Sequence, residues 1–486
     1  MTTRILSSFL VLFSSTVLGA PTRSAAVVAA PGYAVHTIPT PNTVQGGVVR
    51  QGAAIVVGQG SFGGGTEQII RLDGAGTTVI ATGFNSLGGF DLDTTGTLYV
   101  VDNCQECMGA ATGDTLFAIP AALTRTTAVT AVGNEVVPAG AIPFAQDVLI
   151  VPNSSVLVSD AAGPGAGRVV RVQGGVASNF LTGFDYTGGL ALKPDNTLFV
   201  GNVDASFQGS VFKFALDGTP LGTLVSGLSG AYDQVVDNDG NVLVSGGFTP
   251  DFASSTVVAV AADGSVTERA HGFGFSAEMF FDTVHDETLV LDFGVSEITA
   301  ICRDRDGDGL CDADDPCTGA ATVDQPKLAI TKLATPPGDD KLAFKGQMML
   351  PFPFSPALDP GSRGARVLLE GTAGALLDVT IPGGAFDPTT HTGWRANTAG
   401  TAWTYKSPTG VLGVRKVQVK TVPTQPGLVR FAVAGKNGSY PVAPSDLPLR
   451  ATMVLDALSG ECGEASFTAP MPTCAFDATG NTLRCG

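Results

Sequence analysis

The chain has 486 residues, of which 44% are hydrophobic and 15% charged, with 63 Gly and 30 Pro. This length predicts two or three domains, and the composition favours short strands joined by tight turns. The 27 Lys and Arg residues face 44 Asp and Glu residues, so the formal net charge is −17. Such a protein repels nucleic acid phosphates and anionic lipid, which excludes both as main partners.

Residues 1–25 have the three parts of a secretory signal peptide. An apolar run from Ile5 to Leu18 follows Arg4 and ends in small residues. The run is shorter than a bilayer core of about 30 Å requires, and no later segment is long and apolar enough to span one. A buried helix is the alternative interpretation. We therefore expect a secreted protein, either extracellular or periplasmic.

An internal repeat follows the signal peptide. Residues 87–100 and 187–200 match in their glycines, their apolar alternation and their turn residues. Each copy reads as two short alternating strands around a turn rich in Asp, Asn and Gly, which is how a β-hairpin is written in sequence. Weaker copies run over 46–57, 145–158, 231–244 and 277–290. A second hairpin follows each copy, often with an Asp-Gly turn such as that at Asp217.

Two hairpins make four strands, and a four-stranded repeat of about 40 to 50 residues is typical of a propeller blade. One blade cannot cover its own apolar faces, so blades pack around an axis until the ring closes. We therefore predict an all-β chain with a six-bladed β-propeller over residues 40–300. A β-solenoid or a row of sandwich domains is the alternative.

The segment from Gly89 to Val100 reads Gly-x-x-x-Asp-x-x-Gly-x-Leu-Tyr-Val. In this pattern the chain resembles the NHL-like and gluconolactonase-like (SMP-30-like) six-bladed propellers, over about residues 40–300. The resemblance implies the fold, but that class includes binding proteins, lactonases and lyases, so the activity stays open. Gluconolactonase-like enzymes hold a divalent cation in the channel with a Glu, two Asn and an Asp. Near matching positions this chain has Asp147 and Asp233.

Three carboxylates are candidates for a metal or ligand site in the propeller channel. In the register of the repeat, Asp147 and Asp233 take the position that Gly89 and Gly189 hold in other copies. In the last copy, Glu278 stands one residue earlier. Innermost strands converge on the channel, so the three carboxylates are predicted to face one another and to bind a metal or share protons. Solvated strand ends in a polar channel are the alternative.

The strongest local motif is the segment from Cys302 to Cys317, in which carboxylates alternate around glycines. Oxygen ligands at these intervals suit a cation that takes 6 to 8 of them, which indicates Ca²⁺. The segment resembles a single thrombospondin type 3 repeat, D-x-D-x-D-G-x-x-D-x-x-D with flanking Cys. We predict a calcium-binding hinge over residues 301–320, with a solvated acidic linker as the alternative. Its predicted ligands are Asp304, Asp306, Asp308, the carbonyl of Leu310, Asp312 and Asp315.

The eight cysteines fit an oxidising compartment, where disulfides persist. We expect Cys104 and Cys107 to pair locally and close a loop, with C-x-x-C redox chemistry as the alternative. The other six allow 15 pairings, among which the sequence does not choose. These six are Cys302, Cys311, Cys317, Cys462, Cys474 and Cys485.

Residues 325–486 are predicted to form a β-sandwich-like domain of about seven or more strands. Alternating runs such as 414–420 and 428–433 are separated by Pro and Gly turns. Trp394, Trp403 and Tyr405 are either core residues or an exposed platform on which sugar rings stack. The sequence pattern alone leaves both interpretations open.

Familiar catalytic motifs are missing from the sequence, including a Gly-x-Ser-x-Gly elbow, a His-Glu-x-x-His helix and a phosphate-binding loop. We therefore expect a secreted calcium-binding propeller protein with a binding or surface-interaction role, whose extracellular ligand is a carbohydrate or a protein. The alternative is a metal-dependent lactonase, hydrolase or lyase that acts through Asp147, Asp233 and Glu278. Whether the chain is an enzyme is left open, and no catalytic residue is assigned.

Overall fold

The chain divides into two compact units, residues 1–313 (unit 1) and 314–486 (unit 2), and each is described by itself. The predicted signal peptide, the predicted ligand Asp308, and Cys104 and Cys107 lie outside the described residues. The computed structural model describes residues 26–60, 66–103, 113–152, 155–249, 253–307, 309–315, 317–319, 321–334, 336–372, 374–456 and 461–486.

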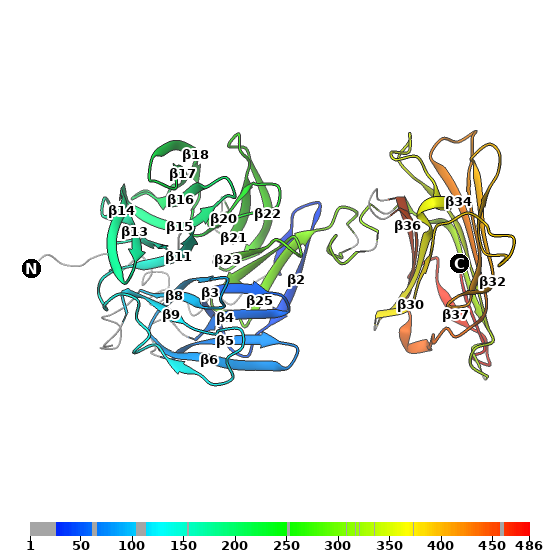
Figure 1. The fold of residues 1–486 in the computed structure, drawn as a ribbon, viewed down its shortest axis with the longest axis horizontal. Helices are drawn as coiled ribbons and strands as arrows, with labels where there is room; N and C mark the ends of the chain where they lie inside the picture. The colour runs from blue at the N-terminus through cyan, green and yellow to red at the C-terminus, as the bar shows by residue number, and fades with distance from the viewer. Residues whose placement is uncertain are drawn as a thin grey trace, which may run out of the picture. The chain divides into compact units, whose positions relative to one another are not determined.

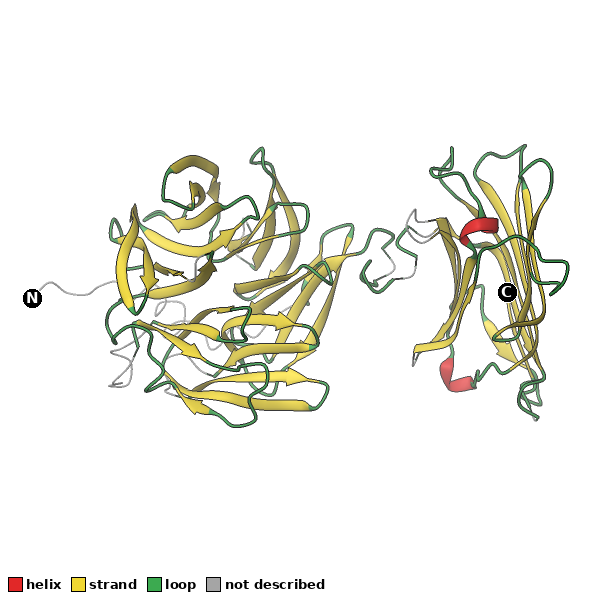
Figure 2. Cartoon of the chain, viewed as in Figure 1, coloured by secondary structure: helices red, strands yellow, loops and turns green. Residues whose placement is uncertain are grey.

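Regular structure is almost entirely β in both units (Figure 2). Within the described ranges, the helical elements are the α-helix α2 (Pro360–Arg363) and the 3-10 helix η2 (Pro444–Asp446), both in unit 2. Among these same residues, no helix has the length and apolar character needed to cross a bilayer. The all-β class predicted from the sequence is confirmed.

The described part of unit 1 contains six sheets, numbered here in chain order (Figure 1). Sheet 1 consists of β3 (Val44–Gln51), β4 (Ala54–Gln59), β5 (Glu67–Asp73), β6 (Gly76–Phe84) and β10 (Val129–Thr130). Sheet 2 consists of β7 (Leu87–Leu92), β8 (Leu98–Asp102) and β9 (Thr115–Ile119). Sheet 3 consists of β11 (Ala145–Val151), β12 (Ser155–Asp160), β13 (Gly167–Gln173) and β14 (Val176–Phe184).

In the other three sheets of unit 1 all strand pairs are antiparallel. Sheet 4 consists of β15 (Tyr186–Leu192), β16 (Thr197–Val203), β17 (Gly209–Ala215) and β18 (Pro220–Leu228). Sheet 5 consists of β19 (Gln234–Val236), β20 (Val242–Phe248), β21 (Ser255–Val260), β22 (Val266–Phe273) and β1 (Val28–Ala29). Sheet 6 consists of β23 (Ser276–Asp282), β24 (Glu287–Asp292), β25 (Glu297–Arg303) and β2 (Tyr33–Pro39).

The six sheets form a closed ring around their first strands. The first strand of each sheet contacts the first strand of the next, and the first strand of sheet 6 contacts that of sheet 1. In order, these inner strands are β3, β7, β11, β15, β19 and β23. Residues far apart in the chain but on inner strands are therefore neighbours at the ring centre.

The alternation of apolar residues explains why the sheets stack face to face. In β12, Val156 and Val158 are buried in a cluster shared with sheet 2, whereas Leu157 between them is buried in a cluster shared with sheet 4. Successive side chains of a strand point to opposite faces, so each sheet presents an apolar surface on both sides. Burial of both faces requires a neighbouring sheet on each side, which a ring provides.

Two strands near the N-terminus complete sheets formed by the end of unit 1. β2 pairs with β25, with Tyr33 opposite Arg303 and Pro39 opposite Glu297, and β1 pairs with β22. The propeller predicted from the sequence begins at residue 40, after both strands. The hairpin pattern misses them because each pairs with a strand more than 200 residues away and not with its neighbour in sequence.

Unit 2 has two sheets in its described part. The five-stranded sheet has the order β26 (Ala321–Thr322), β36 (Glu461–Phe467), β35 (Leu449–Asp456), β29 (Ala365–Gly371) and β30 (Gly374–Ile381). The eight-stranded sheet has the order β31 (Gly393–Ala396), β32 (Ala402–Val411), β33 (Val414–Thr421), β34 (Leu428–Gly438), β28 (Asp340–Met349), β27 (Asp324–Thr331), β38 (Thr482–Cys485) and β37 (Cys474–Phe476). Buried side chains of both sheets belong to one hydrophobic cluster, for example Val367 and Val417.

Candidate functional site

Three carboxylates gather at the ring centre. Asp147 lies on β11, Asp233 directly precedes β19, and Glu278 lies on β23. One carboxylate oxygen from each lies within 4.8 Å of the other two, and the residues are only 6%, 3% and 3% exposed. The structure therefore brings together the three residues that the sequence analysis proposed for the channel. We call Asp147, Asp233 and Glu278 the central cluster.

The alternation of Gly and Asp along the repeat has a steric cause. A Cβ atom added at Gly89 would lie 2.2 Å from Oδ1 of Asp147, and one added at Gly189 would lie 2.2 Å from Oδ1 of Asp233. Each Asp side chain thus occupies the space that a side chain on the preceding sheet would fill. The absence of a side chain at Gly89 and Gly189 leaves the space in which the carboxylate of the next sheet is buried.

The two aspartates also tie neighbouring sheets together. The Asp147 carboxylate accepts hydrogen bonds from the backbone N–H of Val148 (2.7 Å) and, in sheet 4, of Leu190 (2.7 Å). Asp233 repeats this arrangement with the N–H of Gln234 (2.7 Å) and, in sheet 6, of Met279 (2.6 Å). Each carboxylate oxygen accepts one of these bonds and keeps a second lone pair for a proton or a cation.

Polar side chains surround Glu278. The Nε2 atom of Gln146 lies 3.5 Å from Oε1 of Glu278 and donates a long hydrogen bond to it. Tyr232 is half-buried beside the cluster, and its ring makes an edge contact with Phe275 at 5.1 Å between centroids. Burial, and next the charge of Glu278, raises the pKa of the Tyr232 hydroxyl well above its ordinary value. Tyr232 therefore stays a neutral hydroxyl against the central cluster.

The carboxyl groups of the central cluster hold protons far more strongly than exposed carboxyl groups do. Burial raises the pKa of Asp147 to about 7, although hydrogen bonds from Leu190 and Val148 lower it. Burial, followed by the charge of Asp147, raises the pKa of Asp233 well above 3.8. Burial and then the charges of Asp233 and Asp147 raise that of Glu278 well above 4.5. At neutral pH the cluster must therefore carry protons or a bound cation.

Two further inner-strand residues went unnoticed in the sequence analysis. Asp91 on β7 accepts hydrogen bonds from the N–H of Leu92 (2.7 Å) and of Ile150 (2.6 Å), and burial raises its pKa to about 6. Gln146 precedes Asp147 and reaches Glu278. Asp91 could have been found from the sequence, because it stands two residues after Gly89 in the copy of the repeat over residues 87–100.

The predicted calcium ligands of the segment 304–315 are only partly placed by the structure. Asp304 accepts hydrogen bonds from the N–H of Gly307 (2.7 Å) and of Gly309 (2.9 Å), so the chain turns around its carboxylate. Asp312 instead pairs with Arg305, whose Nε lies 3.2 Å from Oδ2. Asp315 belongs to unit 2, where its Oδ1 accepts a hydrogen bond from the N–H of Cys317 (2.8 Å).

Among the described residues, no carboxylate of this segment belongs to a group of three or more ligand atoms within 4.8 Å. Asp306 is described but lies outside any such group, and Asp308 lies outside the described residues. The full ligand set therefore stays a prediction from the sequence.

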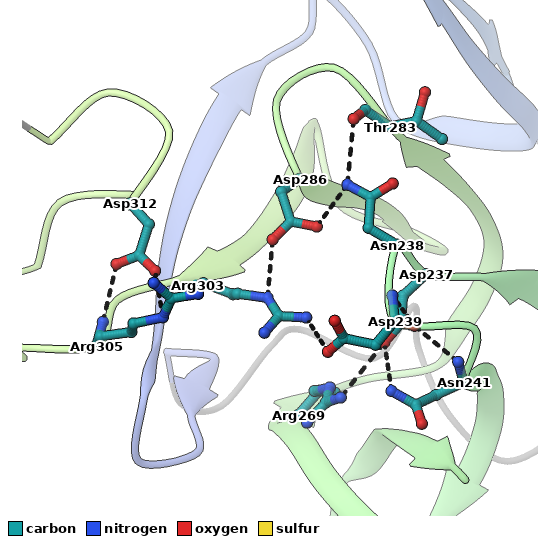
Figure 3. Close-up of polar contacts among 10 residues, drawn as sticks. All are labelled: Asp237, Asn238, Asp239, Asn241, Arg269, Thr283, Asp286, Arg303, Arg305 and Asp312. Carbon is teal, nitrogen blue, oxygen red and sulfur yellow. Dashed lines mark hydrogen bonds and ion pairs between the residues drawn. The ribbon is translucent and has the colours of Figure 1, made fainter. Parts of the chain in front are cut away.

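A polar network attaches the start of this segment to sheets 5 and 6 (Figure 3). Arg303, at the end of β25, pairs with Asp239 and, at 2.8 Å, with Asp286. Burial lowers the pKa of Arg303, but Asp239 and Asp286 outweigh this and raise it. Asn238 joins the network by donating to Oδ1 of Asp286 at 2.8 Å. These contacts hold the end of β25 in place on unit 1.

The structure selects one pairing of the six described cysteines. Cys302 pairs with Cys311, Cys317 with Cys462, and Cys474 with Cys485. The first two bridges enclose parts of the predicted calcium segment, one in each unit. His36 and Glu287 lie beside Cys302 and Cys311, but the two sulfurs are bonded to each other and offer no thiolate ligand.

Trp394, Trp403 and Tyr405 do not form a sugar-stacking platform. They are 3%, 6% and 1% exposed and belong to the core of unit 2, where the rings of Trp394 and Tyr405 lie 5.6 Å apart. The alternative of an exposed platform is therefore wrong. These large apolar rings fill the space between the two sheets, where burial stabilises the fold most.

No family model and no curated protein matches the chain. Several solved structures are similar to part of it. A gluconolactonase from Xanthomonas campestris is 15% identical, with a TM-score of 0.42 over 55% of this chain and 88% of that one. The calcium-binding protein regucalcin from Agrobacterium tumefaciens is 15% identical, with a TM-score of 0.39 over 54% and 91%.

The aldose sugar dehydrogenase of Streptomyces coelicolor, in its PQQ-bound form, is 13% identical, with a TM-score of 0.41 over 56% of this chain and 99% of that one. These three proteins differ in what they bind or act on. At such identities and TM-scores the likeness carries no argument about activity, substrate or cofactor.

Proposed function

We propose that the chain is an exported, calcium-dependent binding protein, in which the central cluster holds a divalent cation at the centre of a six-bladed propeller. One observation supports this above all. Asp147, Asp233 and Glu278 are buried within 4.8 Å of one another, and among the described residues none of them forms an ion pair with Lys, Arg or His. A buried negative charge without a partner is strongly unfavourable, so a positive charge must neutralise it.

The donor atoms favour a hard cation. Three carboxylates and the neighbouring amide of Gln146 offer only oxygen as ligand, which suits Ca²⁺ or Mg²⁺ and not a metal that prefers sulfur or imidazole. The backbone hydrogen bonds to Asp147 and Asp233 hold both side chains in place before a cation arrives. Such preorganisation lowers the entropic cost of binding. Calcium fits the central cluster on these grounds and is the cation we propose.

The wider architecture and location belong to the same proposal. The closed ring of six sheets supports a six-bladed propeller, and the shared core of the two sheets in unit 2 supports a β-sandwich. The three disulfides fit an oxidising compartment outside the cytosol. A second calcium ion in a thrombospondin type 3-like segment, and a carbohydrate or protein ligand, are further parts that rest on the sequence.

Metal content of the purified full chain tests the proposal. After dialysis against calcium and then against metal-free buffer, the wild type should retain one equivalent more than the double variant Asp147→Asn/Asp233→Asn. Asp263→Asn, an exposed turn residue of sheet 5, is the matched control and should retain the wild-type content. Equal content in the double variant and the wild type would overturn the proposal.

A second candidate function is a metal-dependent hydrolase or lyase. The observation that favours it is the buried position of Asp147 within 4.8 Å of two other carboxylates, where burial raises its pKa to about 7, because a carboxylate with a pKa near the working pH can serve as a general base. The same variants separate the two functions. Turnover of lactones or uronides that is lost in Asp147→Asn supports catalysis, whereas a wild type without turnover that still binds the cation supports a binding role.

A further inference from the structure

The charge of the chain is divided unequally between the two units. Unit 1 has 12 Lys and Arg residues against 30 Asp and Glu residues, whereas unit 2 has 15 against 14. The formal charges are therefore −18 for unit 1 and +1 for unit 2. The net charge of the whole chain hides this difference, so the partners of unit 2 follow from the charges on its own surface.

Most basic residues of unit 2 lie on one face of its eight-stranded sheet. In β28, for example, Leu342 and Phe344 are buried in the core of unit 2. Lys341 and Lys345 alternate with them and point to the other face, where they are exposed. Ten basic residues share this outward face, and all are exposed except Lys416, which is half-buried. The ten, which we call the basic face, are Lys327, Lys341, Lys345, Arg395, Lys406, Lys416, Lys420, Arg430, Lys436 and Arg484.

Eight of these ten residues form like-charged pairs across neighbouring strands. The directly opposite residues are Lys327 with Lys345, Lys341 with Lys436, Lys406 with Lys416, and Lys420 with Arg430. Side chains opposite one another have Cβ atoms about 4.5 to 5.5 Å apart, so like charges in these positions destabilise the sheet. Among the described residues, none of the ten forms an ion pair. The sheet therefore carries a repulsion that a bound anion would relieve.

The five-stranded sheet of the same unit has the opposite arrangement. Its two basic residues both pair with acidic residues on a neighbouring strand, namely Arg450 with Glu370 at 2.9 Å and Arg366 with Asp378 at 2.8 Å. In the strands of the eight-stranded sheet the acidic residues are Asp324 and Asp340, and Asp340 is only 5% exposed. The sheet itself thus does not balance the positive charge of the basic face.

The outward residues between the cations are polar or small. One row of directly opposite residues crosses six strands, from β27 to β31, in the order Lys327, Lys345, Ala432, Gln418, Thr404 and Arg395. At about 4.8 Å between strands, the row is about 24 Å long. Cations stand at both ends, and between them the amide of Gln418 and the hydroxyl of Thr404 donate and accept hydrogen bonds. The row therefore suits a linear ligand that carries both anionic and hydroxyl groups.

From this arrangement we propose that the basic face binds a linear acidic polysaccharide, whose anionic groups neutralise the opposed cations. An anionic group bound between two opposed cations replaces one repulsion with two attractions, so the pairs that destabilise the free sheet stabilise the complex. The proposal specifies the carbohydrate ligand of the function proposed above, but it does not require a cation at the central cluster.

Other polyanions fit the basic face less well. The described outward-facing residues of the sheet include no aromatic ring, on which the bases of a single strand would stack. Duplex DNA is read by a helix or a β-ribbon that enters its groove, and a broad sheet does not enter it. Duplex DNA also carries one charge per about 1.7 Å, so unit 1 repels it more strongly than a polymer with one charge per sugar ring. A lipid surface would need large apolar side chains to insert, and the row between Lys327 and Arg395 offers only Ala432.

Binding of polygalacturonate to the full chain in EDTA tests the proposal. The wild type should bind the polymer but not neutral dextran, and the affinity should fall with added salt because binding releases counterions. Lys345→Gln/Lys420→Gln removes one cation from each of two opposed pairs. In this variant binding should be about tenfold weaker, and the slope of log K against log salt smaller by about 2. The control Lys213→Gln/Arg366→Gln removes the same charge from other sheets and should bind as the wild type does.

Asp147→Asn/Asp233→Asn separates this proposal from the proposed function, because it removes the central cluster and should still bind the polymer as tightly as the wild type. Equal affinity of Lys345→Gln/Lys420→Gln and the wild type would overturn the proposal. Tighter binding of duplex DNA or of phosphatidylserine vesicles than of polygalacturonate would equally overturn it, because the face would then belong to a nucleic acid or a membrane. If the lysine variant does not fold, as judged by circular dichroism, the wild type decides. An affinity that stays constant between about 50 mM and 200 mM salt would refute an electrostatic site.

Discussion

Two groups of buried carboxylates in unit 1 differ in how their charge is neutralised. Between sheets 6 and 1, Arg50 reaches Glu287 at 2.6 Å and Asp282 at 3.4 Å. The central cluster has three carboxylates and no such cation among the described residues. Although burial raises the pKa of Asp282, hydrogen bonds from His285 and Val284 lower it below its ordinary value, whereas the pKa of Glu278 is raised.

The difference shows that burial alone does not determine how the charge of a carboxylate is neutralised. Glu287 and Glu278 belong to the same sheet and are 4% and 3% exposed. Glu287 pairs with Arg50 and, at 3.0 Å, with His36, so side chains of the protein neutralise its charge. Glu278 has Gln146 as its polar neighbour, so its charge is left for a proton or an ion from outside.

The largest effect is expected from removal of Arg50. Arg50→Met removes the guanidinium that Asp282 and Glu287 share and leaves them only histidine partners, so the free energy of unfolding should fall by about 3 to 5 kcal/mol. Urea unfolding of the full chain, followed at the unit 1 transition, measures the change. Arg305→Met is the control, since this exposed arginine pairs with Asp312 at the surface and should cost less than about 1 kcal/mol. Equal losses in both variants would contradict a buried clamp at Arg50.

The same substitution in the two glutamates should have opposite effects. In EDTA at pH 8, Glu287→Gln should destabilise unit 1 by about 2 kcal/mol, because Arg50 loses a charged partner. Glu278→Gln removes a repelled charge and should leave unit 1 as stable or more stable by about 1 kcal/mol. With calcium the advantage of Glu278→Gln should vanish. Thermal unfolding of both variants, with and without calcium, measures the effects. If both variants are less stable than the wild type without calcium, the proposed difference between Glu287 and Glu278 is wrong.

A smaller effect is expected from pH. The pKa of Asp147 is higher in the folded protein than its ordinary value of 3.8. Protonation therefore stabilises the calcium-free fold fully below about pH 4, and this contribution is lost as the pH rises through about 7. In EDTA, unit 1 should lose about 1 to 2 kcal/mol between pH 6 and pH 8, since one pKa unit is worth about 1.4 kcal/mol. Asp147→Asn should flatten the profile, and a flat wild-type profile would show that Asp147 is ionised throughout.

The features of unit 1 that depend on local periodicity could be predicted from the sequence. Alignment of the repeats was enough to put Asp147 and Asp233 at one position of the inner strands and Glu278 one residue before it. The ring then brought them together. The burial of Glu67, at the start of β5, was not predicted, because nothing in its own strand distinguishes it from an exposed glutamate. Its burial depends on the start of β7, which lies in another sheet.

Long-range pairing and the burial of individual side chains could not be predicted from the sequence either. The cysteine pairing required the approach of residues as far apart as Cys317 and Cys462, which are 145 positions apart. The burial of Trp394 and Trp403 required knowledge of which face of β31 and β32 packs on the other sheet. Aromatic residues at alternate positions of a strand fit a core or a surface equally well, and only the packing of the sheets decides.

The pairing of β2 with β25 sets a condition on how the protein is made. Tyr33 is among the first described residues to leave the ribosome, and Arg303, opposite it, follows 270 residues later. Until then β2, the outermost strand of sheet 6, lacks its partner β25 and offers an unpaired edge to any strand it meets. The wait would be long at a synthesis rate of about 5 to 20 residues per second. A chaperone that shields β2 during this interval would therefore raise the yield of closed rings.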